Sequence, residues 1–200
     1  MLPACSLPIL ALSRPANVPE RYAGTVVGVS FLDENPGGSL AGPWDDAFWF
    51  ALPAGVQSKS NFRREHKSRA WSDLTLFESE VRSCARAHLP AGWDLGAQDT
   101  KKVAERPGIV VVIYAVSLLD TGNLDKSVLD ALERVCFYTD ASVRSITCLS
   151  ERRRTDQHAA VAVARLAPAA DLAAIIRATS ALTDSLSTTI LPVILPAPVA

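Results

Sequence analysis

The segment Gly108–Leu119, with the sequence GIVVVIYAVSLL, constrains the fold more than any other part of the chain. Apolar residues succeed one another in it without alternation, so a strand formed by this segment would need cover on both faces. Such a strand is typical of the centre of a sheet that carries helices on its two sides. The segment therefore predicts an α/β arrangement with further strands beside this one.

Other segments predict the neighbours of this strand. Ala47–Leu52 is rich in aromatic residues and is followed by Pro53, which indicates a strand. Two more strands are predicted at Ser142–Leu149 and His158–Leu166, joined by a basic turn, Glu151–Arg154. The expected fold class is α/β in the mixed α+β sense: one small mixed sheet of about four strands, flanked by two or three helices.

Apolar residues at helical spacing predict the helices. The first begins at Ser72, a suitable N-cap, and runs to about His88, with an apolar stripe of Leu74, Leu76, Phe77, Val81 and Cys84. The second is capped by Asn123 and ends near Val135, with apolar positions Leu124, Val128, Leu129, Leu132 and Val135. An Ala-rich helix from Leu172 to about Leu186 is the third.

The composition of the two ends predicts the domain organisation. Residues 1–46 are rich in Pro and Gly and show no sustained period, so we expect a poorly ordered N-terminal extension, with Gly24–Leu32 as a candidate added strand. Residues 47–187 would form the folded domain, and residues 188–200 an irregular C-terminal tail.

Charge, hydropathy and cysteine usage limit the environment of the protein. No apolar run reaches the roughly 18 residues of a membrane span, so no membrane partner is expected. Between Gln57 and Arg154 there are 16 Lys and Arg residues against 13 Asp and Glu residues, which permits a polyanionic partner without requiring one. The four cysteines show no CxxC spacing, and we expect Cys84, Cys136 and Cys148 to be small buried residues of a cytoplasmic protein.

Charged residues after the predicted central strand suggest a metal site. Asp120 comes directly after that strand, at the edge of an α/β unit where ligands commonly bind. If the link Cys136–Asp140 is extended, it can carry Asp140 back towards Asp120. Two carboxylates offer the hard oxygen ligands that Mg²⁺ prefers. Lys126, at the third helical position after Asn123, could reach back and stabilise negative charge in a phosphoryl transition state.

Each of these residues also has a purely structural interpretation. Asp120 and Gly122 are standard turn residues and could simply precede a capped helix. Asp130 lies four residues after Lys126 and could form a helix-surface ion pair with it. The basic residues between Asn61 and Arg69 could belong to a solvated loop.

Taken together, these positions resemble the RusA-type Holliday-junction resolvases, small endonucleases found largely in phages and prophages. The family pattern is Asp-x-Asp-Asn-x-x-Lys, then Asp-Ala-Leu, then Asp-Asp-x-x-Val. Asp120, Asn123 and Lys126 match the first part, Asp130-Ala131-Leu132 the second, and Asp140 with Val143 the third. Upstream, the aromatic strand and the polar stretch that ends near Trp71 are similar to the first strand and the DNA-contacting loop of the family, so the resemblance covers about residues 47–166.

The sequence departs from the family pattern at two positions. Gly122 stands where the family has its second Asp, and Thr139 replaces the first Asp of the later pair. The first departure removes a carboxylate that would contribute both charge and an oxygen ligand. Asp125 is close in sequence, but it lies about 100° around the helix from Lys126 and is not expected to replace the missing group.

The resemblance implies an endodeoxyribonuclease that acts as a homodimer on branched DNA such as a four-way junction, with Mg²⁺ or Mn²⁺ and no small-molecule cofactor. It implies Asp120, Lys126 and Asp140 as catalytic residues, with Asp120 and Asp140 holding the metal. Asn123 and Asp130 would support the site, and DNA would contact a set of polar residues: Asn61, Arg63, Arg64, His66, Lys67 and Arg69. Two other hypotheses stay open. The first is a module that binds branched DNA without cutting it. The second is an unrelated α/β enzyme, although the sequence contains no phosphate-binding loop or nucleophile elbow that would support it.

Overall fold

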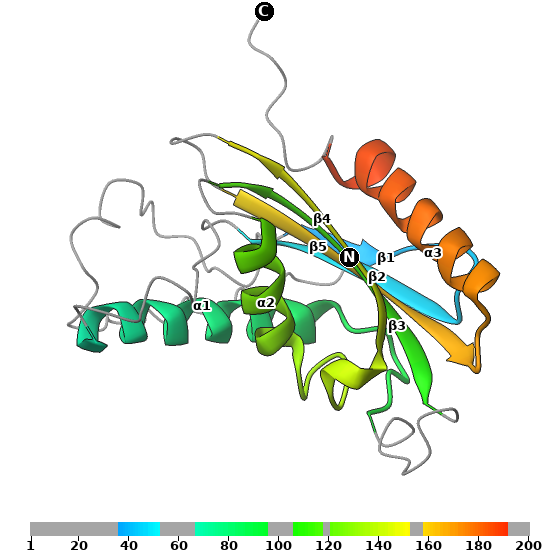
Figure 1. Cartoon of the computed structure of the whole chain (residues 1–200), viewed down its shortest axis with the longest axis horizontal. Helices are drawn as coiled ribbons and strands as arrows, with labels where there is room; N and C mark the ends of the chain where they lie inside the picture. The colour runs from blue at the N-terminus through cyan, green and yellow to red at the C-terminus, as the bar shows by residue number, and fades with distance from the viewer. Residues whose placement is uncertain (1–35, 53–66, 96–105, 118–120, 153–157, 192–200) are drawn as a thin grey trace, which may run out of the picture.

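A computed structural model describes residues 36–52, 67–95, 106–117, 121–152 and 158–191, without the side chains of 67–73 and 121–122. One five-stranded sheet in the order β1-β2-β5-β3-β4 forms its middle layer. The strands are β1 (Gly37–Ser39), β2 (Asp46–Leu52), β3 (Pro107–Val116), β4 (Val143–Glu151) and β5 (His158–Pro168). Helices α1 (Lys67–His88) and α2 (Thr121–Leu132) cover one face, and α3 (Leu172–Ser185) covers the other (Figure 1). The predicted mixed sheet flanked by helices is confirmed.

An interior position of the GIVVVIYAVSLL strand is confirmed as well, although the middle strand of the five is β5 and β3 lies next to it. β3 pairs with β4 in parallel and with β5 antiparallel, so neither of its edges is open. Ile109, Val111 and Ile113 point into the core under α1 and α2. Val110 and Val112 point into the core under α3. Because both faces are covered, the strand needs apolar residues at every position, as the sequence has.

Alanines in β5 shape the layer under α3. Ala160, Ala162 and Ala164 are fully buried on this face, together with Ala178 of the helix. Larger apolar side chains then come from the helical end of the layer, from Leu182, Leu186 and Ile190. The last two belong to a π-helical turn, Leu186–Ile190, that continues α3. Small residues on the strand therefore leave room for the leucines of the helix.

Several boundaries differ from the prediction. β1 lies within the segment predicted to be a poorly ordered extension, where it pairs antiparallel with β2. Helix α1 begins at Lys67 and not at Ser72, since the residues before Ser72 include the good helix formers Lys, Arg and Ala. Leu76 is 51% exposed because it lies about 200° around the helix from Leu74, off the buried stripe. The candidate strand Gly24–Leu32 and the tail from residue 192 lie outside the described residues.

Helix α2 also differs at both ends. It begins at Thr121, so Asn123 is its third residue and not its cap. The Asn123 carbonyl accepts a hydrogen bond of 3.0 Å from the buried Ser127 hydroxyl one turn later. The helix ends at Leu132, three residues before the predicted end, because Arg134 takes a φ of 65° and turns the chain.

Trp93, which lies shortly after α1, joins three parts of the structure. Its indole N–H donates a hydrogen bond of 3.0 Å to the carbonyl of Cys136, in the turn after α2. Its ring packs edge-on against Phe48 of β2 with 5.2 Å between the centroids, and the Arg165 guanidinium lies 5.1 Å from its centroid. The preceding Gly92 has a φ of 88°, which only glycine adopts without strain. The end of α1 is therefore fixed to β2, β5 and the turn after α2.

The cysteines and the helices bear on two of the predictions, the burial of three cysteines and the lack of a membrane span. Cys84, Cys136 and Cys148 are free thiols; the first two are buried and Cys148 is half-buried. Among the described helices, none combines the length and hydropathy needed to cross a bilayer.

Replacement of Phe48 by alanine should lower the free energy of unfolding by about 3–5 kcal/mol, because this fully buried ring packs against Phe50 and Trp93. Urea unfolding followed by circular dichroism measures the change. Leu172→Ala is the matched control, since Leu172 is 71% exposed, and it should change the stability by less than about 0.5 kcal/mol. Equal losses in the two variants would contradict the assigned core.

Candidate functional site

The candidate site lies at the end of the sheet where the parallel strands β3 and β4 finish and α2 begins; this end is called the candidate edge. In the parallel register Val116 lies opposite Glu151, and the Ser117 N–H donates to the Glu151 carbonyl at 3.0 Å. The chain then enters α2 at Thr121, so the first turn of this helix starts from the same edge (Figure 1). Ligands commonly bind at this end of parallel strands. Asp120 belongs to this stretch of sequence but lies outside the described residues.

Lys126 is an exposed residue in the first half of α2. Its ammonium forms no ion pair with another described residue, so the helix-surface pair with Asp130 is not formed. Its backbone N–H donates to the Asp125 carboxylate at 2.6 Å. Lys126 is therefore a solvent-facing cation, but it is the sixth residue of α2 and lies further along the helix than the predicted third position after a cap at Asn123.

Asp125 lies on the side of α2 that faces β4. Burial and the nearby Asp125 carboxylate together raise the pKa of the Cys148 thiol to about 11. Cys148 is three residues before the end of β4, and α2 packs against this strand.

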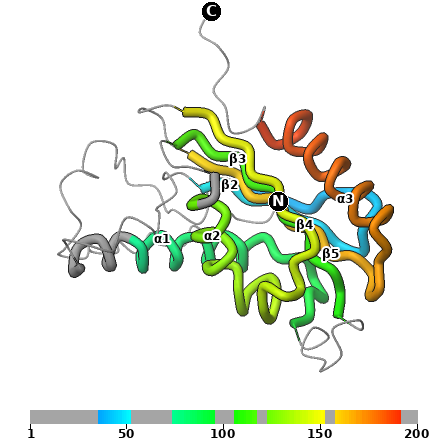
Figure 2. Tube along the Cα trace, viewed as in Figure 1, coloured from blue at the N-terminus to red at the C-terminus, as the bar shows by residue number. Residues whose placement is uncertain are grey.

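Asp140 lies at the opposite end of the strands, where β3 and β4 begin. It begins a single 3-10 turn, Asp140–Ser142, that leads into β4, and its exposed carboxylate accepts a hydrogen bond of 3.1 Å from the Thr139 hydroxyl. Val143 pairs with Ile109, near the start of β3, whereas Glu151 pairs with Val116 near its end. A nine-residue strand spans roughly 26 Å at about 3.3 Å per residue. Figure 2 traces this course from α2 into β4.

The extended link expected between Cys136 and Asp140 is not formed. Instead, the chain turns tightly after α2: the Cys136 N–H donates to the Leu132 carbonyl at 2.9 Å, and the Arg134 N–H donates to the Phe137 carbonyl at 2.7 Å. The Arg134 guanidinium lies 3.7 Å from the centroid of the Tyr138 ring, which favours the turn. Asp140 therefore lies near the end of α2, before β4 begins at Val143, and not near the start of the helix.

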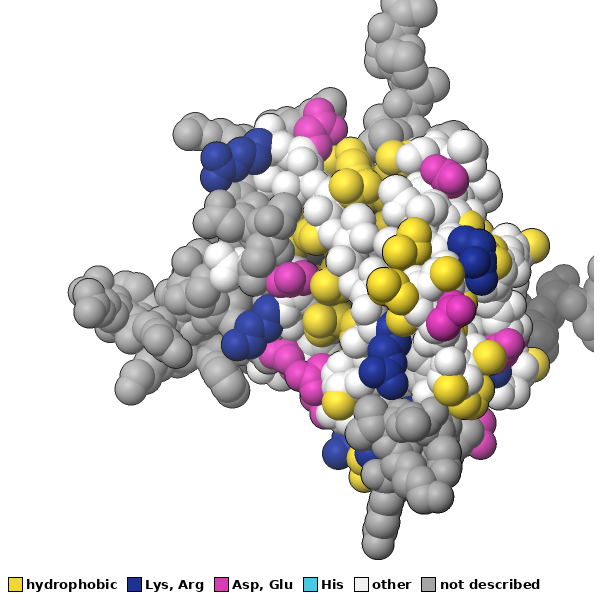
Figure 3. All heavy atoms as spheres, turned by 45° about the vertical axis from the view of Figure 1, so that its right-hand side comes forward, with side chains coloured by type: hydrophobic (Ala, Val, Ile, Leu, Met, Phe, Trp, Pro, Cys, Tyr) yellow, Lys and Arg dark blue, Asp and Glu magenta, His cyan; other side chains and the backbone are white. Residues whose placement is uncertain are grey.

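The predicted DNA-contacting residues are described only in part. Asn61, Arg63, Arg64 and His66 lie outside the described residues, while Lys67 and Arg69 lie in the first turn of α1 without described side chains. The segment expected to be a loop is therefore helical from Lys67 onwards. On the face shown in Figure 3, the described basic and acidic side chains are interspersed and do not form a single basic patch.

Three polar side chains that the sequence patterns did not single out lie where β3 and β4 end and β5 begins, and Tyr114 and Glu151 among them face the side of the sheet that α3 covers, not the side that carries α2. The Tyr114 hydroxyl lies 3.2 Å from a carboxylate oxygen of Glu151, and the His158 ring lies 6.2 Å from the Tyr114 ring between centroids. Glu151 and His158 both lie opposite Val116, one on each side of β3. The sequence gives only a weak signal for them, because each is a single polar residue at or near one end of its strand.

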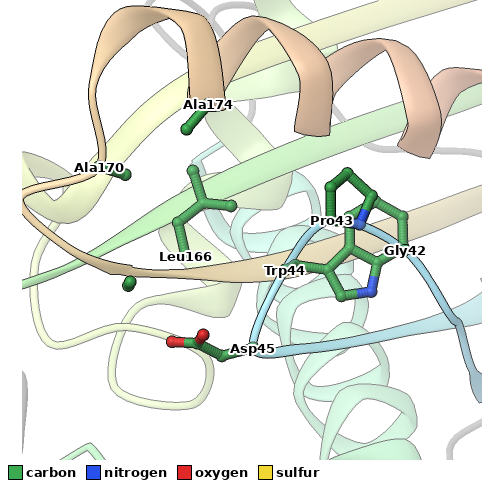
Figure 4. A pocket seen from close by; sticks show the side chains of 8 residues that line it. Gly42, Pro43, Trp44, Asp45, Leu166, Ala170 and Ala174 are labelled. Atoms are coloured by element: carbon green, nitrogen blue, oxygen red, sulfur yellow. The ribbon is translucent and has the colours of Figure 1, made fainter.

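A shallow hollow of about 350 Å³ lies at the other end of the molecule, between the turn before β2 and the start of α3 (Figure 4). Its lining is mainly apolar, with Trp44, Leu166 and Ala174 on its walls and Asp45 at its rim. Leu166 lies near the end of β5, opposite Gly108 at the start of β3. The hollow is therefore separate from the edge where α2 begins.

Comparisons with known proteins add no identification. No protein-family model matches the sequence, and no curated protein matches it. Within the part of the chain that the structure describes, no three His, Cys, Asp or Glu side chains are grouped closely enough to hold a metal ion.

Asp125→Asn should make the Cys148 thiol react faster with iodoacetamide between about pH 8 and 9. Removal of the negative charge lowers the pKa of the thiol, so a larger fraction is thiolate at a given pH, while the asparagine oxygen still accepts the Lys126 N–H. Mass spectrometry of the Cys148 peptide measures the rate. Asp184→Asn on the exposed side of α3 is the control. Identical rates in all three proteins would contradict the contribution of Asp125 to the pKa of the Cys148 thiol.

Proposed function

We propose that the chain is a magnesium-dependent endodeoxyribonuclease of the crossover-junction type, which resolves Holliday junctions or other branched DNA by paired phosphodiester nicks. The order Asp120, Asn123 and Lys126 directly after the central strand is the observation that carries this proposal. The exposed position of Lys126 in the first half of α2 supports it. So does the general preference of ligands for the edge where parallel strands end.

Each group has one task in this proposal. Lys126 would stabilise the negative charge that develops on the reacting phosphate, and Asp120 would contribute an oxygen ligand to the cation. Bound Mg²⁺ or Mn²⁺ supplies Lewis-acid chemistry at the phosphodiester. Basic residues of Asn61–Arg69 and Arg152–Arg154 would hold neighbouring phosphates in a way that does not depend on sequence. A homodimer would present two such sites, as paired nicks require.

Asp140, the second carboxylate that the family resemblance implies, lies away from the start of α2. Asp140 precedes β4 at one edge of the sheet, and Thr121, the residue next to Asp120 in the sequence, opens α2 at the other edge. A Mg²⁺ ion needs its oxygen ligands at about 2.0–2.1 Å, so a carboxylate that lies a strand's length from the start of α2 cannot bind an ion held there. No step of the reaction is therefore assigned to Asp140.

A second candidate function is a module that binds branched DNA without cutting it. Gly122 in place of a family carboxylate favours this function, and so does the position of Asp140. Such a module would keep its phosphate contacts, because these depend on basic residues and not on the metal site.

Incubation of the full-length protein with a synthetic four-way junction and Mg²⁺ should yield symmetric paired nicks on a denaturing gel. The Asp120→Asn variant should lower the rate of cleavage by at least about 100-fold, since loss of one group aimed at the transition state commonly costs this much. The junction should still bind the variant in a gel-shift assay, with an affinity that falls as salt rises.

Asp184→Asn makes the same chemical change on the exposed side of α3 and should leave the rate of cleavage unchanged. Salt-sensitive binding of the junction without nicks in Mg²⁺ or Mn²⁺ would contradict the endonuclease and support the binding module. Absence of both binding and cleavage would contradict both functions.

A further inference from the structure

We propose that the lateral edge of the sheet, formed by β4, binds a second copy of this chain through antiparallel pairing of the two β4 strands. This edge runs along the strand and is distinct from the candidate edge, at which β3 and β4 finish. The inference concerns how two copies meet, and it does not rest on the proposed nuclease activity. The surface involved, called the β4 surface, combines residues of β4 and of the neighbouring side of α3: Ser145, Thr147, Leu149, Leu172, Ile176 and Thr179.

β4 is an edge strand in the described part of the chain, where it pairs with β3 and with no other strand. The Glu151 carbonyl accepts from the Ser117 N–H, so the backbone groups of Glu151 and of every second residue before it point towards β3. The backbone groups of Ile146, Cys148 and Ser150 therefore point away from β3, towards the lateral edge. β4 has nine residues without proline or lysine, and proteins commonly use these two residues to protect an edge strand from pairing. Such an edge favours the addition of another strand.

The side of α3 next to β4 adds exposed apolar side chains to this edge. The Thr179 hydroxyl lies 2.9 Å from the Ser145 hydroxyl, which places this side of the helix beside β4. Leu172 and Ile176 lie about 20° and about 60° around the helix from Thr179, so they are on the same side. They are 71% and 56% exposed, and Leu149 of β4 is 38% exposed. Three of the four large apolar side chains that are exposed among the described residues therefore belong to the β4 surface. Figure 3, in which the right-hand side of Figure 1 with α3 is turned forward, shows exposed hydrophobic side chains on this face.

A second copy fits this surface because β4 is complementary to itself. Antiparallel pairing centred on Thr147 uses all nine residues of both strands. Leu149 of each copy then lies opposite Ser145 of the other, and Ser145 is the residue that contacts α3. The small Ser145 side chain leaves room for Leu149 next to Ile176. One two-fold operation therefore covers the exposed apolar side chains of both copies, as an isologous interface requires.

The charges of the strand favour the same register. In the pairing centred on Thr147, Arg144 of one copy lies opposite Ser150 of the other, so its charge meets no second cation. A pairing centred on Cys148 would instead place Arg144 opposite Arg152 of the other copy. Like charges directly opposite each other destabilise a strand pair. The register centred on Thr147 therefore combines the longest overlap with an absence of repulsion.

A cysteine at the two-fold axis tests the register. The backbone groups of Thr147 point towards β3, so the two copies of this residue form a non-hydrogen-bonded pair with their Cα atoms about 4.5 Å apart, within the range of about 4.4–6.8 Å that a disulfide spans. Mild oxidation of full-length Thr147→Cys should therefore link two chains, as seen on a non-reducing gel. Linkage should be at least about tenfold faster than in Ser79→Cys, whose cysteine is exposed on α1. The unsubstituted protein, which keeps its own cysteines, gives the background rate.

Substitution of exposed leucines tests the surface itself, with analytical ultracentrifugation of the full-length protein without DNA as the readout. The unsubstituted protein should sediment as two chains. Leu149→Lys should raise the dissociation constant of the dimer at least about tenfold, because two charges would enter the apolar contact. Leu76→Lys is the matched control: Leu76 is 51% exposed on α1, and its replacement should leave the dimer intact. Ile176→Lys, on the helix, should weaken the dimer in the same way as Leu149→Lys, and it keeps the test valid if the strand variant does not fold.

Three results would overturn the proposal. The first is an unsubstituted protein that sediments as a single chain at every concentration. The second is a dimer that Ile176→Lys and a folded Leu149→Lys leave intact. The third is linkage of Thr147→Cys no faster than that of Ser79→Cys. A dimer that behaves as expected but cuts no junction would contradict only the proposed nuclease.

Discussion

The parallel pairing of β3 with β4 is the constraint on which the rest of the structure depends. A parallel neighbour requires a crossover, and α2 provides it on the face that α1 also covers. The residues just before β4 therefore lie at one edge of the sheet, and the residues just after β3 lie at the other. β5 closes the remaining side of β3 in antiparallel register, which leaves the central strand without a free edge. This pairing places Asp140 away from the start of α2.

Local sequence patterns were sufficient for most of the regular elements. The uninterrupted apolar residues of β3 indicated a strand covered on both faces, and the aromatic run of β2 ended where Pro53 was expected to end it. The apolar spacing of α1 identified Leu74, Phe77 and Val81 as core residues. These predictions succeed because burial of one face imposes a period that the residues themselves display.

Long-range features could not be derived in the same way. The start of α2 at Thr121 and the turn at Arg134 depend on how the chain packs, and Asn123 was a plausible cap on composition alone. An extended link before Asp140 was compatible with the sequence, since the turn that replaces it depends on a contact between Arg134 and Tyr138. The meeting of Tyr114, Glu151 and His158 depends on strand order, which no single segment encodes.

The strand order also determines when the chain can fold during synthesis. β5 lies between β2 and β3 in the sheet, although it is the last strand in the sequence. Until residue 168 has left the ribosome, β2 and β3 each lack the neighbour that joins them, and their apolar faces remain without α3. Between the synthesis of β3 and that of β5 the nascent chain therefore presents two open, hydrophobic strand edges, which are prone to pair with other chains.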